Sequence, residues 1–203
     1  MLIIIDYGMG NLRSVQKGFE RVGCRPVISR DPSQIGQADG IVLPGVGAFR
    51  DGMQHLAEYG LIEPIKSHIA KGLPFLGICL GLQMLFEESE EFGCEKGLGV
   101  FKGRVVRFPR DMELKVPHMG WNQLQIIRRP PILQDVPPSS FVYFVHSYYV
   151  VPEDKAIVAV TSSYGVEFCS MIWQDNIFAT QFHPEKSQEL GLGILKRFAE
   201  LCI

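Results

Sequence analysis

Cys79 is the residue of this sequence best placed to act as a nucleophile. It is the centre of Gly77-Ile-Cys-Leu-Gly81, between the apolar stretch Leu73–Ile78 and a helix-prone run over Leu80–Phe86. Glycines two places before and after a nucleophile, at a strand-to-helix junction, are typical of a nucleophile elbow, whose tight turn strains the central residue. The N-terminus of the following helix favours a thiolate. The pattern predicts a reactive cysteine, although a glycine-flanked cysteine can also simply pack at the end of a buried strand.

A second cluster, Gln181-Phe-His-Pro-Glu185, could provide an acid–base pair. The stretch before it alternates like a strand, and the proline after His183 favours an extended backbone there. Residues i and i+2 of an extended segment face the same side, so we expect His183 and Glu185 to project together. A carboxylate beside an imidazole fixes its tautomer and stabilises the imidazolium. We therefore predict a triad of Cys79, His183 and Glu185, the alternative being a buried strand histidine bonded to the backbone.

A third element is Ile41-Val-Leu-Pro-Gly-Val-Gly47, a buried-looking strand that runs into a glycine-rich loop. An acyl-transfer site needs backbone N–H groups directed at the developing oxyanion, commonly from the residue after the nucleophile and from a neighbouring strand-end loop. We expect Leu80 to supply the first, and the loop to supply the second through Val46 and Gly47. On its own, such a loop is also compatible with an ordinary turn before a helix.

The residues around Cys79 and His183 resemble the signature of class I (triad) glutamine amidotransferases. The likeness lies in Gly77-Ile-Cys-Leu-Gly-Leu-Gln83 and Phe182-His-Pro-Glu185. Other segments resemble one branch of that family, the glutaminase subunits of imidazole glycerol phosphate synthases. These segments are Asp6-Tyr-Gly-Met-Gly-Asn-Leu12, Pro44-Gly-Val-Gly-Ala-Phe49, Pro117-His-Met-Gly-Trp-Asn122, Phe144-Val-His-Ser-Tyr-Tyr149 and His183-Pro-Glu-Lys-Ser187. The matches span residues 6 to 187, so the resemblance covers essentially the whole chain.

The resemblance implies a thioester mechanism for glutamine hydrolysis. Cys79 would attack the side-chain amide of glutamine, and His183 would protonate the departing ammonia and then activate the water that releases glutamate. The residues that the resemblance implies for substrate binding are Gly47, Gln83, Ser147 and Tyr148. For Gln83 the alternative is an ordinary helical position, and for Ser147 and Tyr148 it is strand packing.

The acceptor of the ammonia is expected on another chain, because no nucleotide-binding loop or second domain is visible in this sequence. The resemblance implies a heterodimer with a (β/α)8-barrel cyclase subunit. That subunit would use the ammonia to make imidazole glycerol phosphate and an aminoimidazole carboxamide ribonucleotide in histidine biosynthesis. Trp121, Tyr143 and Lys186 are expected near this interface, although a core also uses large aromatic residues. We expect low activity from the isolated chain.

Composition limits the other possibilities. A chain of 203 residues, 46% hydrophobic and 21% charged, can bury one core, so a single domain over residues 1–203 is expected. A net charge of −2 with scattered basic residues predicts no nucleic-acid partner. Five cysteines without C-x-x-C pairs or zinc-ligand spacing predict no metal site and no disulfide framework, and we also expect no cofactor. Without a basic leader or a run of ~20 apolar residues, we expect a cytoplasmic protein with no membrane contact.

Hydrophobic periodicity predicts the elements that would position these residues. Strand, helix and strand alternate in the first half, with strands at Leu2–Ile5, Pro26–Ser29 and Gly40–Leu43 and helices from Leu12 to before Gly23 and over Leu61–Lys71. Strands follow at Arg104–Phe108, Asn122–Arg128, Phe141–Val151, Ala156–Ser162, Glu167–Trp173 and Ile177–Phe182, and a helix at Gln188–Leu201. The pattern predicts a three-layer α/β domain with a mostly parallel central sheet and an antiparallel extension. In such sheets, ligands bind at the carboxyl ends of the strands.

Some features have less informative interpretations, and other functions stay open. We expect the acidic run Glu87–Glu91 to be a solvated helix end or loop, while His118 and His146 lack a neighbouring carboxylate that would make either a better base than His183. One alternative is a glutaminase that serves anthranilate, GMP or pyridoxal phosphate synthesis, distinguished by the contexts His118–Asn122 and His183–Ser187. A non-enzymatic regulatory module, or a hydrolase of another class, on the same fold is the other.

Overall fold

Four strands of the first half of the chain and one late strand form the main parallel part of a twelve-stranded sheet. The computed structural model describes residues 1–202. Its parallel strands are β1 (Leu2–Ile5), β2 (Val27–Ser29), β3 (Gly40–Gly45), β4 (Phe75–Cys79) and β14 (Ile177–Thr180), in the order β2-β1-β3-β4-β14. Four of them are buried along their whole length, which is why the sequence reads as continuous apolar runs there.

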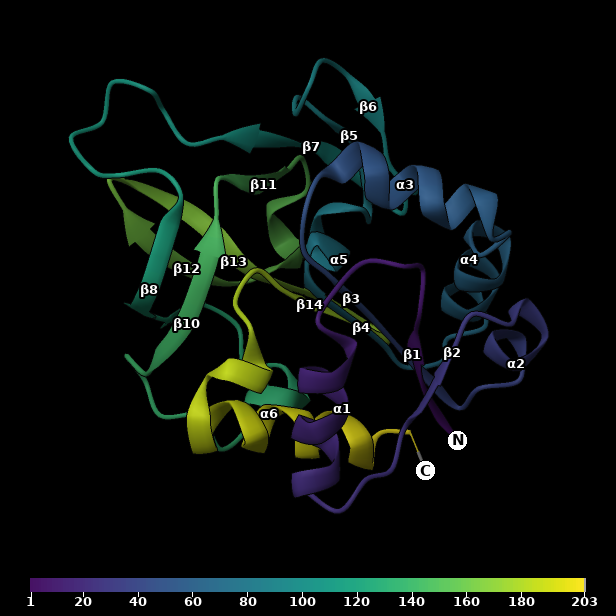
Figure 1. The fold of residues 1–203 in the computed structure, drawn as a ribbon. Helices are drawn as coiled ribbons and strands as arrows, with labels where there is room; N and C mark the ends of the chain where they lie inside the picture. The colour runs from purple at the N-terminus through teal and green to yellow at the C-terminus, as the bar shows by residue number, and fades with distance from the viewer. Residues whose placement is uncertain (203) are drawn as a thin grey trace.

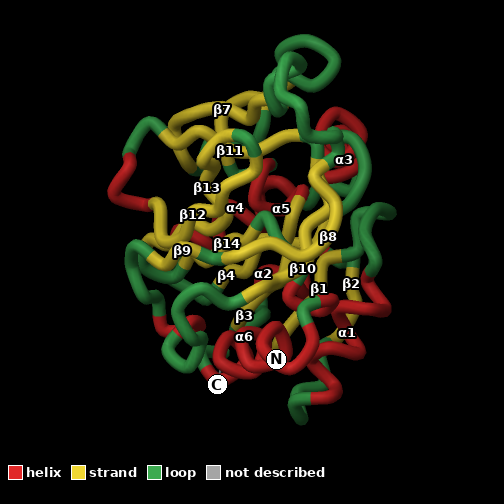
Figure 2. The backbone as a smooth tube through the Cα atoms, turned by 90° about the vertical axis from the view of Figure 1, so that its left-hand side faces the viewer, coloured by secondary structure: helices red, strands yellow, loops and turns green. Residues whose placement is uncertain are grey.

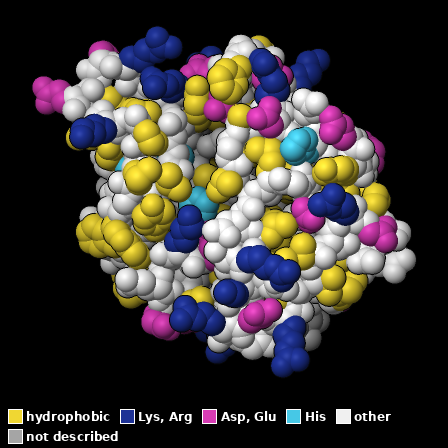
Figure 3. All heavy atoms as spheres, in the orientation of Figure 1, with side chains coloured by type: hydrophobic (Ala, Val, Ile, Leu, Met, Phe, Trp, Pro, Cys, Tyr) yellow, Lys and Arg dark blue, Asp and Glu magenta, His cyan; other side chains and the backbone are white. Residues whose placement is uncertain are grey.

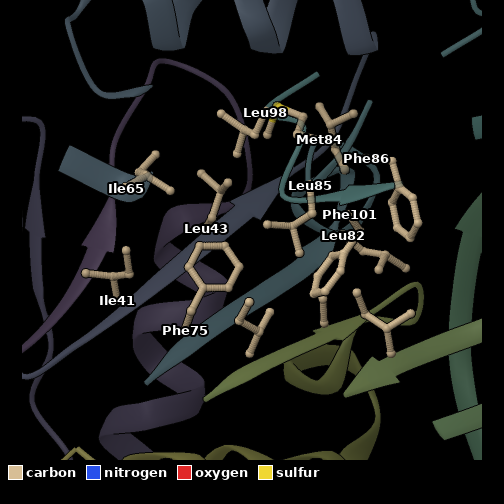
Figure 4. Close-up of a cluster of buried hydrophobic side chains, with 14 of the residues drawn as sticks. Ile41, Leu43, Ile65, Phe75, Leu82, Met84, Leu85, Phe86, Leu98 and Phe101 are labelled. Atoms are coloured by element: carbon tan, nitrogen blue, oxygen red, sulfur yellow. The ribbon is translucent and has the colours of Figure 1, made fainter. Parts of the chain in front are cut away.

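Helices cover both faces of this sheet (Figure 1). They are α1 (Leu12–Arg21), α2 (Pro32–Gly36), α3 (Phe49–Glu58), α4 (Ile62–Ala70), the one-turn α5 (Leu80–Gln83) and α6 (Gln188–Glu200). Successive residues of β1 point to opposite faces, so Ile3 packs with α3 and α4 while Ile4 packs with α1 and α6. Figure 4 shows part of the first of these two clusters, where Ile41 and Phe75 lie beneath Ile65 of α4. The predicted three-layer fold is confirmed.

The rest of this sheet is a mainly antiparallel extension. Beyond β14 the sheet continues in the order β13-β11-β7-β5-β6, and β12 pairs with β13 and β9. These strands are β5 (Phe86–Ser89), β6 (Glu95–Lys96), β7 (Phe101–Arg107), β9 (Gln125–Ile126), β11 (Tyr148–Pro152), β12 (Val158–Tyr164) and β13 (Val166–Gln174). The 3-10 helices η1 (Pro131–Leu133), η2 (Lys155–Ile157) and η3 (Pro184–Lys186) complete the chain.

Strands β8 (His118–Gln123) and β10 (Phe141–His146) form a separate antiparallel pair. Figure 2 shows them side by side on the face turned to the viewer. The prediction of one continuous strand over Phe141–Val151 is therefore wrong, because the chain leaves this pair at Ser147 and enters the main sheet as β11. Alternation reports which face a residue occupies but not which strand it pairs with, so it misses such an exchange.

Among the other boundaries that differ from the prediction, three have the same cause. The helix expected over Leu80–Phe86 is a single turn, because Phe86 begins β5 and pairs with β7. The strand expected over Asn122–Arg128 is divided between β8 and β9, which belong to different sheets. Strand β14 ends at Thr180, two residues earlier than expected. In each case the tertiary partner overrides local propensity.

Two glycines of α6 provide a matched test of how tightly this helix packs against η3. A Cβ on Gly191 would lie 1.9 Å from the backbone oxygen of Pro184, whereas a Cβ on Gly193 would meet nothing within 4 Å. Gly191→Ala is expected to lower the free energy of unfolding by about 1–3 kcal/mol, because a backbone group must move. Gly193→Ala is expected to raise it by about 0.5–1 kcal/mol through helix propensity. Urea denaturation measures both, and similar effects at the two positions would refute the close contact.

Candidate active site

Cys79 lies at a strained turn between β4 and α5. Its backbone has φ 55° and ψ −104°, and residues other than glycine rarely adopt a positive φ. The flanking glycines permit the turn because a Cβ on Gly81 would lie 1.9 Å from the Leu43 oxygen and one on Gly77 would lie 2.9 Å from the Gly81 oxygen. The structure thus has the backbone of the predicted nucleophile elbow, with Cys79 6% exposed.

His183 and Glu185 form a buried pair. His183 Nδ1 lies 2.8 Å from Glu185 Oε1, and the two side chains are 3% and 1% exposed. The two residues meet as expected but not through an extended segment, because Pro184 starts η3 and Glu185 lies within this 3-10 turn. Proline suits the first turn of a helix, since its φ is already fixed near the helical value and no N–H is lost there. His183 itself is extended as expected, with φ −100° and ψ 97°, and the chain turns only after it.

The sheet order brings Cys79 and His183 together. Strand β14 lies directly beside β4 in parallel register, with Thr180 opposite Ile78, so both residues leave the sheet at the same end. His183 Nε2 is buried without a conventional hydrogen bond, and it is the ring nitrogen opposite the one bonded to Glu185. Burial by itself lowers the pKa of His183, but the Cys79 thiolate and the Glu185 carboxylate outweigh burial and raise this pKa to about 10. The arrangement favours the protonated form of the His183 imidazole.

Replacing Cys79 by Ala is expected to lower the pKa of His183, because burial would then be opposed by Glu185 alone. A histidine pKa raised from 6.5 to about 10 stabilises the fold fully below about pH 6.5, and this contribution disappears as the pH rises through 10. The free energy of unfolding of the wild type should therefore fall over that range relative to Cys79→Ala. NMR titration of the imidazole measures the pKa, with Cys94→Ala, at an exposed cysteine, as the control. The same His183 pKa in wild type and Cys79→Ala would exclude the thiolate as its neighbour.

A cleft of about 320 Å³ opens at Cys79. Its lining residues are Val46, Gly47, Cys79, Leu80, Gln83, Glu91, Val145, His146, Ser147 and Tyr148. Every residue expected in the oxyanion hole or in substrate binding is therefore at this cleft. Gly47, with φ +100°, and the exposed Val46 form the loop after β3 on one side. The turn between β10 and β11 forms the other side.

Glu91 belongs to this cleft, and strand β5 includes Glu87 and Glu88, so the expectation that the run Glu87–Glu91 is a solvated helix end or loop is wrong. Glu91 Oε2 accepts a hydrogen bond from the Phe49 N–H at 2.7 Å, at the start of α3. A carboxylate is favourable at that position because the first backbone N–H groups of a helix have no partner within the helix. Glu91 is the one acidic side chain among the lining residues. No sequence signal separates it from its acidic neighbours, because they share the same composition and spacing.

Two buried glutamines connect the cysteine to the cleft wall. Gln181 Nε2 lies 3.5 Å from Cys79 Sγ. Gln83 Nε2 lies 3.1 Å from Gln181 Oε1 and 3.0 Å from the backbone oxygen of Tyr148. Gln181 is fully buried. Gln181 has no predicted role, but the sequence contains one signal for it, because a residue two positions before His183 in an extended segment faces the same side.

Trp121, Tyr143 and Lys186 gather on the surface beside His183. The Trp121 and Tyr143 rings are 6.2 Å apart, and Lys186 Nζ lies 5.6 Å from the centre of the Tyr143 ring. The backbone oxygen of Tyr143 accepts a hydrogen bond from the backbone N–H of His183 at 3.0 Å. Trp121 is 47% exposed, so it is not a core residue.

Apolar residues of the two-stranded sheet extend this surface. Met119 and Phe141 are 62% and 56% exposed, and apolar side chains gather over β8 and β10 in Figure 3. We name this surface, formed by Met119, Trp121, Phe141 and Tyr143, the β8–β10 face. Within residues 1–202, no helix has the length and apolarity needed to cross a membrane, and no three or more His, Cys, Asp or Glu side chains are grouped to hold a metal ion.

Known proteins resemble the chain over its full length. The family model for glutamine amidotransferase class-I matches residues 3–201. The imidazole glycerol phosphate synthase subunit HisH of Syntrophotalea carbinolica is 61% identical, covering 99% of this chain and 100% of the relative. The subunit of the same name from Geobacter sulfurreducens is 60% identical, with 98% of each chain covered.

Solved structures share the fold at low sequence identity. A crystal structure of a glutamine amidotransferase superposes with a TM-score of 0.76 at 19% identity, covering 98% of both chains. PurLQS from Thermotoga maritima gives a TM-score of 0.72 at 17% identity, covering 99% of this chain and 96% of the other. The chain belongs to the class-I glutamine amidotransferases, and within them to the family of the imidazole glycerol phosphate synthase subunit HisH.

Proposed function

We propose that this glutamine amidotransferase hydrolyses glutamine with Cys79 as the nucleophile, His183 as the acid and base, and Glu185 as the group that orients the imidazole. One observation carries the assignment. The strained cysteine follows the strand next to that of His183 and acts on its imidazole, whose Nδ1 is bonded to a buried carboxylate. The imidazole can then supply a proton to the departing group, and the carboxylate charge stabilises the imidazolium.

The reaction steps follow from this arrangement. The Cys79 sulfur forms a bond to the side-chain carbonyl carbon of glutamine, and the electron pair of that carbonyl moves to its oxygen. When the carbonyl re-forms, the carbon–nitrogen bond breaks, the nitrogen takes the proton from His183 Nε2, and ammonia leaves a glutamyl thioester. Water then attacks the thioester while Nε2 accepts its proton, and the carbon–sulfur bond breaks to release glutamate. Glu185 accepts from Nδ1–H throughout, which keeps Nε2 as the reacting nitrogen.

The cleft residues divide the binding of glutamine among them. The backbone N–H groups of Val46, Gly47 and Leu80 are proposed to stabilise the oxyanion, where one donor is worth about 2.7–4 kcal/mol. The Glu91 carboxylate is proposed to receive the α-ammonium group of glutamine, because it is the one acidic group lining the cleft. The turn that contains Ser147 and Tyr148, together with Gln83, would hold the rest of the substrate.

We further propose that the ammonia passes to a (β/α)8-barrel cyclase subunit, in a heterodimer whose interface includes the β8–β10 face and Lys186. Exposed aromatic residues and methionine are typical of interfaces, and this face adjoins the acid–base residue through the bond between the Tyr143 oxygen and the His183 N–H. The names of the 60–61% identical relatives support imidazole glycerol phosphate synthesis over the other synthases.

A partner-dependent assay tests this function. Glutamate release is expected to be low for the isolated chain and to rise when the cyclase subunit of the same organism and its nucleotide substrate are added. Trp121→Ala should weaken co-elution of the two subunits, while Tyr59→Ala, at an exposed aromatic residue of another surface, should not. An equally active isolated chain would contradict the dependence on the partner. No glutamate release from the complete complex would favour a non-enzymatic module.

A further inference from the structure

One backbone oxygen in the cleft wall receives two side-chain donors. The Tyr148 oxygen lies 3.0 Å from Gln83 Nε2 and 2.8 Å from His146 Nδ1. A carbonyl oxygen can only accept hydrogen bonds, so both nitrogens must carry hydrogen. This single acceptor therefore fixes the orientation of one amide and the tautomer of one imidazole, and each of these determines the next group along its own branch.

The amide branch leads to the nucleophile. Gln83 Nε2 uses one hydrogen for Tyr148, and its other hydrogen faces Gln181 at 3.1 Å, so the atom of Gln181 that meets it must be the acceptor Oε1. The Gln181 amino group is then the group left to face Cys79 Sγ at 3.5 Å. Neither amide can be flipped without placing two donors, or two acceptors, against each other. A donor directed at the sulfur stabilises its thiolate form.

The imidazole branch leads away from the cleft. Because His146 Nδ1 carries hydrogen, its Nε2 is an acceptor, and His118 Nδ1 at 2.9 Å must be the donor to it. His118 Nε2 is then an acceptor, and the Asn122 amino group lies 3.2 Å from it. The same amino group donates to the Ser163 oxygen at 2.9 Å, which independently fixes the orientation of this amide. The proton positions derived from the two ends of the branch agree.

The histidine pair is built to remain neutral and rigid. Burial lowers the pKa of His118 to about 4, and burial, only partly offset by the bond to the Tyr148 oxygen, lowers that of His146 to about 3. The His118 ring stacks between Tyr164, with ring centres 4.0 Å apart, and Phe144 at 4.9 Å. Every ring nitrogen of the pair has a partner. The pair therefore supports the turn between β10 and β11 rather than transferring protons in the reaction.

We propose that Gln181 is a positioning residue for Cys79, and that His118 and His146 are positioning residues for the substrate-binding turn at Tyr148, joined to Gln181 through Gln83. This inference rests on the proposed glutaminase function and extends it to residues that the proposed mechanism does not use. The amide branch acts on the thiolate and hence on the chemical step. The imidazole branch acts on the cleft wall and hence on glutamine binding.

NMR of the full chain tests the imidazole branch without any turnover. Long-range ¹H–¹⁵N correlations are expected to show both His118 and His146 neutral and protonated on Nδ1 at neutral pH, whereas free imidazole side chains favour Nε2–H. In His118→Phe, which fits the aromatic surroundings, the KM for glutamine should rise with a smaller change in kcat. Protonation of either ring on Nε2, or an unchanged KM in a folded His118→Phe, would overturn this branch.

Alkylation of Cys79 by iodoacetamide, followed by peptide mapping, tests the amide branch. In Gln181→Leu the pH profile of alkylation should move to higher pH, and kcat in the complex should fall about 10- to 100-fold with little change in KM, as expected for a lost hydrogen bond to a charged group. Gln54→Leu, at an exposed glutamine whose amino group donates to Glu58, is the control. A folded Gln181→Leu with an unchanged alkylation profile would overturn this branch.

A second variant covers the case in which Gln181→Leu does not fold. Gln181→Asn keeps the amide but withdraws it from the sulfur by one methylene, and the same shift in the alkylation profile is expected. Thermal unfolding shows whether each variant is folded. A variant that loses activity only because it is less stable would unfold at a lower temperature without a shift of the alkylation profile. If the wild-type complex released no glutamate, the proposed function would fail, while the tautomers and the alkylation profile would still report on the positioning network.

Discussion

Cys79→Ala is expected to reduce glutamate release by at least about 10⁴-fold in kcat, since the thioester route then has no nucleophile. Ala tolerates the φ of 55° no better than Cys, so the turn keeps its strain, and stability should fall only by the small loss of packing and by the lost contribution of Cys79 to the raised pKa of His183. Cys79→Gly should be equally inactive but more stable than Cys79→Ala by about 1 kcal/mol, because glycine adopts this conformation without strain. Assays of glutamate release in the complex, together with urea denaturation, measure both effects.

The control for this prediction is Cys94→Ala, which changes an exposed cysteine whose sulfur is hydrogen-bonded to Glu88. It should retain full activity. Cys79→Ala and Cys94→Ala should both co-elute with the cyclase subunit as the wild type does. Substantial glutamate release from Cys79→Ala would require another nucleophile and would contradict the assignment. Lower stability of Cys79→Gly than of Cys79→Ala would contradict the strained turn.

The second large effect is expected at Glu185. Glu185→Gln has nearly the same shape but removes the charge that helps to raise the pKa of His183, and its amide can present a donor to Nδ1. Because the wrong tautomer would then leave Nε2 without the proton for the departing ammonia, kcat should fall about 10³- to 10⁴-fold. Steady-state kinetics and NMR titration of His183 measure the loss of rate and the lowered pKa.

Glu189→Gln is the matched control for Glu185→Gln, because Glu189 is an exposed glutamate in the first turn of α6. It should leave both kcat and the pKa of His183 unchanged. If Glu185→Gln kept near-normal kcat, or left the pKa of His183 near 10, the buried carboxylate would not be the orienting group. A loss of activity caused only by unfolding would appear as a lower midpoint in urea.

Much of the architecture could be predicted because the features that specify it are local. The apolar run Leu2–Ile5 and the capped helix from Leu12 were predicted with the boundaries that the structure has at their starts. The pair of glycines around Cys79 predicted its turn, since no other residue permits such close contact with Leu43 and β14. Because the parallel strands lie side by side in one sheet, their carboxyl ends meet at the same edge.

What the sequence could not supply depends on partners distant along the chain. The break at Ser147 requires knowing that Phe141–His146 pairs with β8 and not with β7. The place of Glu91 in the cleft depends on its bond to the Phe49 N–H, 42 positions away. The bond between Gln181 and Cys79 likewise joins segments 102 positions apart. Neither composition nor periodicity contains such long-range pairings.

Covalent trapping tests the central claim most directly. The complete complex would be incubated with a glutamine analogue that carries an electrophilic ketone in place of the amide, and the product analysed by intact mass and peptide mapping. The account predicts one adduct per chain, located on Cys79, that is absent from Cys79→Ala and slower to form in Glu185→Gln. An adduct on another cysteine, or undiminished labelling of Cys79→Ala, would contradict it.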